Sequence, residues 1–246
     1  MDNQTIAANG IMPVRERRIL RARLIRVQSV TSLPLVVQAG LPVFIFAMLS
    51  MAAIDPALAM LMKSHVTGEF ARIMRAISDL GIGTGYIAAS ALGLAGAFFC
   101  RRMKLAPRHE AVLARLQRFC LLSLAGFAAS GAVVNLTKLL AGRHRPRDLF
   151  GQSEYGFAPF KFLHGLDSFP SGHSQTIFVV ATVFALAMPK RWRSLGLAAS
   201  LVAASRVVMT NHYLSDVVVG SYVGIAAVLL IAPFILKDGD APALRY

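Results

Sequence analysis

Cysteine, tryptophan and acidic residues are scarce in this sequence of 246 residues. It contains two cysteines and one tryptophan, and 12 acidic residues stand against 26 lysines and arginines. Cys100 and Cys120 lie at the ends of apolar runs that flank one basic stretch, so we expect free thiols with neither a disulfide nor a metal role. The sequence also has no Walker loop, which excludes nucleotide-driven transport, and no G-x-S-x-G motif, which argues against a serine hydrolase.

Polar residues are too few for an ordinary soluble domain. Hydrophobic residues make up 56% of the chain and charged residues 15%, and the mean hydropathy is +0.59. Several apolar runs approach the roughly 20 residues that a helix needs to cross a bilayer. The net charge of +14 does not indicate a nucleic-acid partner, because the basic residues lie beside these runs and no nucleic-acid motif accompanies them. The sequence therefore predicts an integral membrane protein with one domain.

Six apolar runs predict an all-α polytopic protein with six transmembrane helices. The predicted spans cover residues 33–53, 83–100, 119–140, 174–188, 194–209 and 217–236. Residues 57–80 place apolar side chains at helical spacing, which predicts an amphipathic helix at the membrane interface. The predicted parts are a basic cytoplasmic N-terminal segment (1–32), a six-span membrane domain (33–236) and a short cytoplasmic tail (237–246).

The basic residues also predict an orientation. They lie before the first span, between the second and third, and between the fourth and fifth, so the positive-inside rule places both termini in the cytoplasm. The loop 142–170 and the turn 210–216 then face the outside, which is the periplasm for a protein of the inner membrane. The cations of this loop run against the rule, which suggests that they serve a purpose there. Ala57-Leu58-Ala59 looks like a signal-peptidase site, so cleavage of residues 1–59 stays open.

Three polar clusters fall on the predicted outer face. They are Lys138 with Arg145-Pro146, then Pro170-Ser171-Gly172-His173, then Ser205-Arg206 with His212 and Asp216. Arg206 lies inside an apolar run, where an ionisable side chain costs several kcal/mol unless it faces a polar cavity or a partner. Snorkelling to the outer interface is the other account of Arg206 and of Lys138. The helix that starts at Ser171 presents free N–H groups, which make an anion site.

The histidines suit phosphoryl chemistry. His212 and Asp216 are four residues apart, so the carboxylate can bond one imidazole nitrogen and leave the other as a nucleophile. His173, at a helix start, suits a general acid. Two other chemistries stay open: these three side chains as metal ligands, and Ser171 or Ser174 as a nucleophile. Converging cations repel a metal ion and suit a phosphate better than an acyl group, so we expect no metal and no cofactor.

The three clusters resemble the signature of the type 2 phosphatidic acid phosphatase superfamily. That signature reads K-x6-R-P, P-S-G-H and S-R-x5-H-x3-D, and all three parts match in order and spacing over residues 138–216. The resemblance implies that His212 attacks phosphorus to form a phosphohistidine, that Asp216 orients it, and that His173 protonates the leaving oxygen. It also implies that the phosphoryl oxygens are bound by Lys138, Arg145, Ser171, Gly172 and Arg206.

This resemblance implies a metal-independent lipid phosphatase at the outer leaflet. Its partner would be a membrane lipid with a terminal phosphate or diphosphate: lipid A, undecaprenyl diphosphate or phosphatidylglycerol phosphate. A lipid-to-lipid phosphotransferase and a non-catalytic phospholipid transporter are the alternatives, while the similar vanadate-dependent haloperoxidases are soluble. The oligomeric state stays open. Five loop residues outside the signature are expected to be solvated, with headgroup recognition as the other reading: Arg143, His144, Arg147, Asp148 and His164.

Overall fold

The computed structural model describes residues 34–160, 165–237 and 240, and the regular elements in these ranges are all helical. The helices are α2 (Leu35–Gln38), α3 (Gly40–Leu49), α4 (Asp55–His65), α5 (Gly68–Asp79), α6 (Gly83–Arg102), α7 (Glu110–Ala141), α8 (Pro146–Gln152), α9 (Gly172–Ala187), α10 (Trp192–Val208) and α11 (Leu214–Ile235). A π-helical segment, Ser50–Ile54, joins α3 to α4. The predictions for residues 1–32, for His164 and for most of the tail 237–246 lie outside the described residues.

Four helical stretches among the described residues are long and apolar enough to cross a membrane. They are Leu35–His65, Gly68–Arg102, Pro107–Ala141 and Leu214–Ile235, and α9 is a shorter apolar helix. The chain is therefore an all-helical membrane protein, as the apolar runs predict. The count of six spans stays a prediction.

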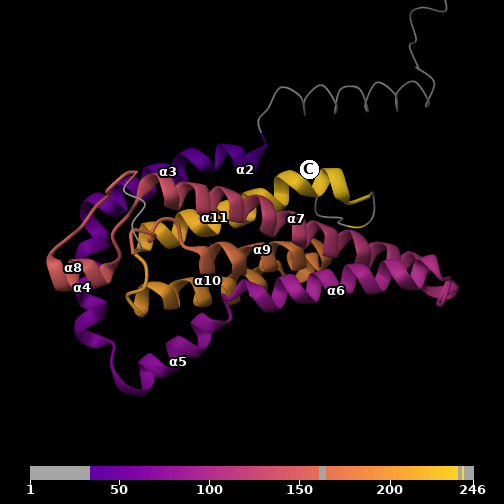
Figure 1. Cartoon of the computed structure of the whole chain (residues 1–246), viewed down its shortest axis with the longest axis horizontal. Coiled ribbons are helices and arrows are strands. Elements are labelled where there is room, and N and C mark those ends of the chain that lie inside the picture. The colour runs from indigo at the N-terminus through magenta and orange to yellow at the C-terminus, as the bar shows by residue number, and fades with distance from the viewer. Residues whose placement is uncertain (1–33, 161–164, 238–239, 241–246) are drawn as a thin grey trace, which may run out of the picture.

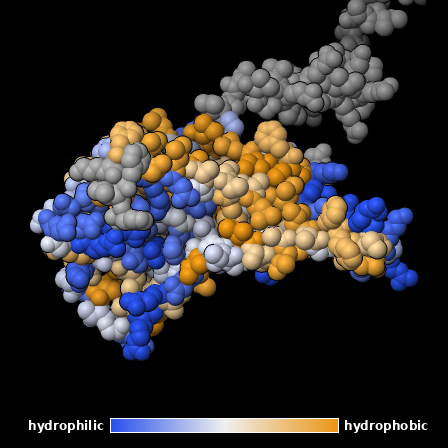
Figure 2. Space-filling model, viewed as in Figure 1, coloured by the Kyte–Doolittle hydropathy of each residue, from blue (hydrophilic) through white to orange (hydrophobic). Residues whose placement is uncertain are grey.

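The long helices run along one axis of the molecule. In Figure 1, the turn between α6 and α7 lies at one end of this axis, and α4 and α8 lie at the other. Figure 2 shows polar residues gathered at both ends and a hydrophobic band between them on the face that is drawn. This distribution is expected of a bundle whose middle lies in lipid and whose ends reach the two headgroup layers.

Helix α9 packs against α7, α10 and α11. Two glycines of α11 allow a close approach, since an added Cβ at Gly220 would lie 2.4 Å from the Ser171 carbonyl oxygen, and one at Gly224 would lie 2.4 Å from that of Gln175. Small residues at such positions let two membrane helices pack backbone to backbone. The start of α9 is thereby held against the first turns of α11.

Residues 57–80 do not form the single amphipathic helix that the sequence predicts. Helix α4 ends at His65, because Val66 and Thr67 are extended and Gly68 follows with a φ of +60°. Two β-branched residues before a left-handed glycine favour such a break. Beyond the break α5 packs against α10, and an interfacial location for it stays a prediction.

Candidate active site

Four helix ends bring the predicted site residues to one end of the bundle, the end at which α8 lies (Figure 1). Lys138 lies in the last turn of α7, His173 in the first turn of α9, Arg206 in the last turn of α10, and His212 in the turn before α11. His173 is close enough to the other three to interact with them electrostatically. The structure therefore brings together residues from three sequence clusters.

The imidazole of His212 is buried and held in one tautomer. Its Nδ1 lies 2.8 Å from the Ser168 carbonyl oxygen, and a carbonyl only accepts, so Nδ1 carries the proton and Nε2 keeps its lone pair. Asp216 Oδ2 lies 3.5 Å from the same Nδ1. Burial lowers the pKa of His212, which keeps the ring neutral near pH 7. Ser168 is thus the closer partner of His212, and the sequence analysis did not single it out.

Asp216 is fully buried and bonded on both carboxylate oxygens. The Ser168 hydroxyl donates to Oδ2 at 2.6 Å, and the Tyr213 backbone N–H donates to the same oxygen at 2.9 Å. Oδ1 accepts from the Arg143 guanidinium in a buried ion pair. Three groups therefore fix the carboxylate beside His212.

The expectation that Arg143 is a solvated loop residue is wrong. Its side chain is 0% exposed, and its guanidinium lies over the rings of Tyr155, Phe157, Phe169 and Tyr213. Burial of a guanidinium requires partners for its charge, and these are carboxylates far away in the sequence. The one signal in the sequence was that cations in this loop run against the positive-inside rule.

The cations predicted to bind phosphate have protein partners. Arg145 donates from Nε and Nη2 to the carboxylate of Asp167 at 2.8 and 2.9 Å, and Lys138 Nζ donates to the Asp167 carbonyl oxygen at 2.8 Å. Burial raises the pKa of Asp167, but Arg145 and Lys138 outweigh it and lower the pKa, so this carboxyl stays ionised. A phosphate that binds Arg145 must therefore share or displace Asp167.

Of the three cations predicted to bind phosphate, Arg206 has a buried donor without a partner in the described part of the chain. Its Nη1 donates to the Ser78 hydroxyl at 2.6 Å, and its Nε is buried with no hydrogen-bond partner among the described residues. Ser78 comes from the end of α5, which the sequence analysis did not connect with the site. Since a buried donor without a partner is costly, this Nε is placed to receive an oxyanion.

The start of α9 has the form of an anion site. Ser171 caps the helix, with its hydroxyl 3.5 Å from the Ser174 backbone nitrogen, and its own N–H donates to the Asp216 carbonyl oxygen at 2.9 Å. A Cβ added at Gly172 would meet nothing within 4 Å, so the space beside the first turn is open. His173 packs against Gly81, whose added Cβ would lie 2.9 Å from that of His173. A phosphate at this place would face free N–H groups and the positive end of the helix.

The two other chemistries find less support in this geometry. The described residues contain no group of three His, Cys, Asp or Glu side chains arranged to hold a metal ion. The Ser174 hydroxyl donates to that of Ser171 at 3.1 Å, and no hydrogen bond in the described part of the chain joins either hydroxyl to a histidine. A serine nucleophile needs such a base within reach.

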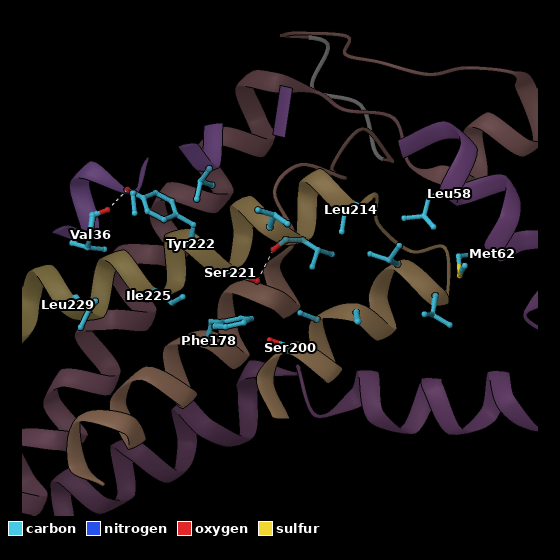
Figure 3. Close-up of a pocket in the computed structure, with 18 of the residues that line it drawn as sticks. Val36, Leu58, Met62, Phe178, Ser200, Leu214, Ser221, Tyr222, Ile225 and Leu229 are labelled. Atoms are coloured by element: carbon cyan, nitrogen blue, oxygen red, sulfur yellow. Dashed lines mark hydrogen bonds between the residues drawn. The ribbon is translucent and has the colours of Figure 1, made fainter. Parts of the chain in front are cut away.

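An apolar groove lies along α11, and Figure 3 shows residues that line it. It has a volume of about 790 Å³ and runs along α11 from Leu214 to Leu229, and residues of α2, α3, α4, α9 and α10 also line it. The Tyr222 hydroxyl donates to the Val36 carbonyl oxygen at 3.0 Å and ties α2 to α11. At 1.5 Å per residue, the 15-residue step along α11 is about 22 Å, comparable to an extended acyl chain. The groove thus offers an apolar path whose end at Leu214 lies two residues along the chain from His212.

Comparison with known proteins identifies a family model and several similar sequences. The model of the PAP2 superfamily matches residues 119–240, a segment that contains all the predicted site residues. The chain is 38% identical to the lipid A 1-phosphatase of Rhizobium johnstonii over 111 residues, 45% of each chain. It is 36% identical to the lipid A 1-phosphatase of Porphyromonas gingivalis over 104 residues, which are 41% of this chain and 20% of that one. The matches thus cover less than half the length of these relatives.

A solved structure shares the fold. The crystal structure of the first transmembrane PAP2 type phosphatidylglycerolphosphate phosphatase from Bacillus subtilis superposes with a TM-score of 0.55, covering 79% of this chain and 94% of that chain. The two sequences are 23% identical in this alignment, so the likeness concerns the fold alone.

Proposed function

We propose that the protein is a membrane lipid phosphatase that removes the 1-phosphate of lipid A. The reaction class is supported by the match of residues 119–240 to the PAP2 superfamily. We choose lipid A as the substrate because the chain is similar to lipid A 1-phosphatases. Undecaprenyl diphosphate and phosphatidylglycerol phosphate are the other candidates. The observation that carries the proposal is His212, whose Nδ1–H is bound to the Ser168 carbonyl oxygen, so that Nε2 keeps its lone pair, and whose ring is near enough to Arg145 and Arg206 to interact with them electrostatically. A neutral imidazole held in this way can attack the phosphorus atom of a bound phosphate whose negative charge is partly neutralised by the cations.

The proposed reaction passes through a phosphohistidine. His212 Nε2 attacks phosphorus, and a P–N bond forms as the bond to the lipid oxygen breaks, while His173 donates a proton to that oxygen. Burial and Arg206 lower the pKa of His173 to about 4, so the negative charge of the bound phosphate has to raise this pKa before His173 can carry the proton. Water then attacks the phosphohistidine, His173 takes a proton from it, and Nε2 leaves with the electron pair to release phosphate. Asp216 stabilises the positive ring from 3.5 Å, and the step uses neither a metal nor a cofactor.

In this proposal, the cations and the start of α9 bind the phosphate. Arg206 Nε and the open first turn at Gly172 have donors or space free for the phosphoryl oxygens. Lys138 and Arg145 bind them by exchanging contacts with Asp167, and Ser171 lies beside them at the helix cap. The groove along α11 would take an acyl chain of the same lipid.

The proposed topology places this site at the outer leaflet of the inner membrane. Residues 33–236 would form the six-span domain, with residues 1–32 and 237–246 in the cytoplasm. The support is that the basic α6–α7 turn and the site lie at opposite ends of the bundle (Figures 1 and 2), as the positive-inside rule requires of a cytoplasmic turn.

The test is phosphate release by the purified protein in detergent, with EDTA present. Lipid A, undecaprenyl diphosphate and phosphatidylglycerol phosphate are offered separately, each beside a His212→Ala control. We expect release from lipid A that EDTA does not affect and that the substitution abolishes. With lipid A labelled in its 1-phosphate, rapid quenching should also trap an acid-labile label on the wild-type protein alone.

Other outcomes would contradict parts of the proposal. Release that EDTA stops would overturn the metal-free mechanism, and release from another of the three lipids would replace the substrate. Label that moves to an added acceptor lipid instead of water would identify a lipid-to-lipid phosphotransferase. Binding of lipid without turnover would identify a transporter or binding protein.

A further inference from the structure

Asp55 is a buried carboxylate that lies outside the segment matched by the family model. It is 1% exposed and starts α4, in the middle of an apolar stretch of sequence. Its Oδ1 accepts from the Ser50 hydroxyl at 2.7 Å and from the Ser215 backbone N–H at 3.2 Å, and its Oδ2 accepts from the Ser215 hydroxyl. A buried carboxylate with this many donors in a membrane helix is costly to keep and points to a function.

Arg143 connects Asp55 with the site. One guanidinium nitrogen, Nη2, lies 2.8 Å from Asp55 Oδ2, and the other, Nη1, donates to Asp216 Oδ1 and to the Ser215 hydroxyl at 2.7 Å. Both carboxylates and the guanidinium are 0% exposed. One buried positive charge is therefore divided between two buried negative charges.

We propose that Asp55 is a positioning residue for His212, acting through Arg143 and Asp216. This inference rests on the proposed function, since it assigns the residue to the same phosphoryl transfer. By holding half of the guanidinium, Asp55 leaves Asp216 with more of its negative charge. That charge stabilises the ring of His212 as it becomes positive on attack.

Removal of the Asp55 charge therefore has a definite electrostatic sign. The guanidinium would then neutralise Asp216 alone, and the surroundings of His212 would become more positive. Nearby positive charge disfavours the imidazolium and lowers both the basicity and the nucleophilicity of the ring. The charged and titratable groups that face His212 from the packed elements are Asp216 of α11, Arg206 of α10, His173 of α9, and Arg145 and Asp167 of the loop.

Asp55→Asn is the variant that tests this, and it should fold. In the wild type, Asp55 and Asp216 share the guanidinium of Arg143. The variant keeps the buried pair of Arg143 with Asp216, so no buried charge is left without a partner. The matched control is Asp240→Asn. Asp240 is also buried and pairs with an arginine, Arg118 Nε, at 2.5 Å, but Arg118 precedes Lys138 by 20 residues of α7, or about 30 Å.

The experiment measures kcat against pH for release of phosphate from lipid A. It also follows the titration of His212 by NMR in detergent, assigned with His212→Gln. In Asp55→Asn we expect kcat to fall roughly tenfold, as when an outer partner of a functional histidine is lost. We expect the acid limb of the profile and the NMR pKa to move down together by about half a pH unit or more. Asp240→Asn should match the wild type in both.

A structural role alone would lower the folded fraction and leave both pH readouts unchanged, and that result would overturn the inference. If Asp55→Asn does not fold, Ser215→Ala takes its place, because it removes a hydroxyl that bridges Asp55 Oδ2 and Arg143 Nη1, while it keeps every charge and the direct contact between Asp55 and Arg143 Nη2. A smaller shift in the same direction supports the inference, and no shift overturns it. If wild-type protein releases no phosphate, the proposed function fails, while the NMR titration still decides whether Asp55 acts on His212.

Discussion

At the level of single residues, burial sets the pH range in which His212 can attack phosphorus. A protonated ring has no lone pair on Nε2, and burial lowers the pKa of His212 below the ordinary imidazole value of about 6.5. As the pH falls through that value, the ring therefore stays neutral, and kcat/KM should hold until the pH reaches the lowered pKa. The measurement is kcat/KM between about pH 4.5 and 8. An acid limb at or above the ordinary value would contradict this account.

We expect Asp167 to control how readily Arg145 binds an oxyanion. The carboxylate holds both guanidinium nitrogens that face it, so it competes with phosphate for the same donors. Asp167→Asn keeps the shape and removes the competing charge. We expect the inhibition constant of inorganic phosphate to fall roughly three- to tenfold, which corresponds to the net contribution of about 1 kcal/mol of one ordinary hydrogen bond.

Glu154→Gln serves as the control for this variant. Glu154 lies in the same loop and loses the same charge, but its carboxylate lies 3.2 Å from His144 Nδ1 rather than beside a cation of the site. An unchanged constant in Asp167→Asn, or an equal fall in both variants, would show that Asp167 does not compete at Arg145.

The residues of the site divide into those that the sequence could predict and those that it could not. His173, His212 and Asp216 belong to a spaced signature, and the structure brings them to one end of the bundle. Asp55 and Arg143 are 88 positions apart, and their burial depends on a tertiary pairing that no local pattern contains. The only signal in the sequence is that Asp55 is a charge within an apolar stretch and that Arg143 is a cation in a loop predicted to face the outside.

At the level of helices, the close approach of α9 and α11 aligns the two halves of the site. An alanine Cβ at position 220 would lie 2.4 Å from the Ser171 carbonyl oxygen, so Gly220→Ala must push the start of α9 away from α11. We expect a loss of about 1–3 kcal/mol in stability and a larger loss of activity than of folded protein. The checks are the apparent Tm in detergent and kcat at a temperature well below it.

Gly196→Ala is the matched control. Gly196 lies in α10, where an added Cβ meets nothing within 4 Å, so the change should leave activity intact and raise stability by up to about 1 kcal/mol through helix propensity. If Gly220→Ala melts and turns over like Gly196→Ala, the contact between α9 and α11 is not what aligns the site.

The helices themselves were largely predictable, because Gly, Pro and basic residues punctuate the apolar runs. Helices α6, α9, α10 and α11 begin and end close to the predicted bounds. The break between α4 and α5 was not predictable from periodicity, since the apolar spacing continues across Val66 and Thr67. Beyond that break α5 packs on α10, which brings Ser78 to Arg206.

At the level of the whole molecule, α7 relates the site to the opposite membrane face. Its 32 residues make it about 48 Å long, more than the roughly 30 Å of a hydrocarbon core. Lys138 lies near one end, and the basic residues of the α6–α7 turn lie at the other. The two ends should therefore emerge on opposite sides, with the site on the outside.

Single cysteines test this orientation in a background in which Cys100 and Cys120 are replaced by alanine. Gln152→Cys at the end of α8 and Met103→Cys at the end of α6 are both exposed positions and lie at opposite ends of the bundle. A membrane-impermeant maleimide added to intact spheroplasts should label Gln152→Cys at once, and Met103→Cys only after permeabilisation. The reverse pattern would place the site in the cytoplasm and require a substrate in the inner leaflet, whereas equal labelling of both before permeabilisation would mean that α6 and α7 do not cross the membrane.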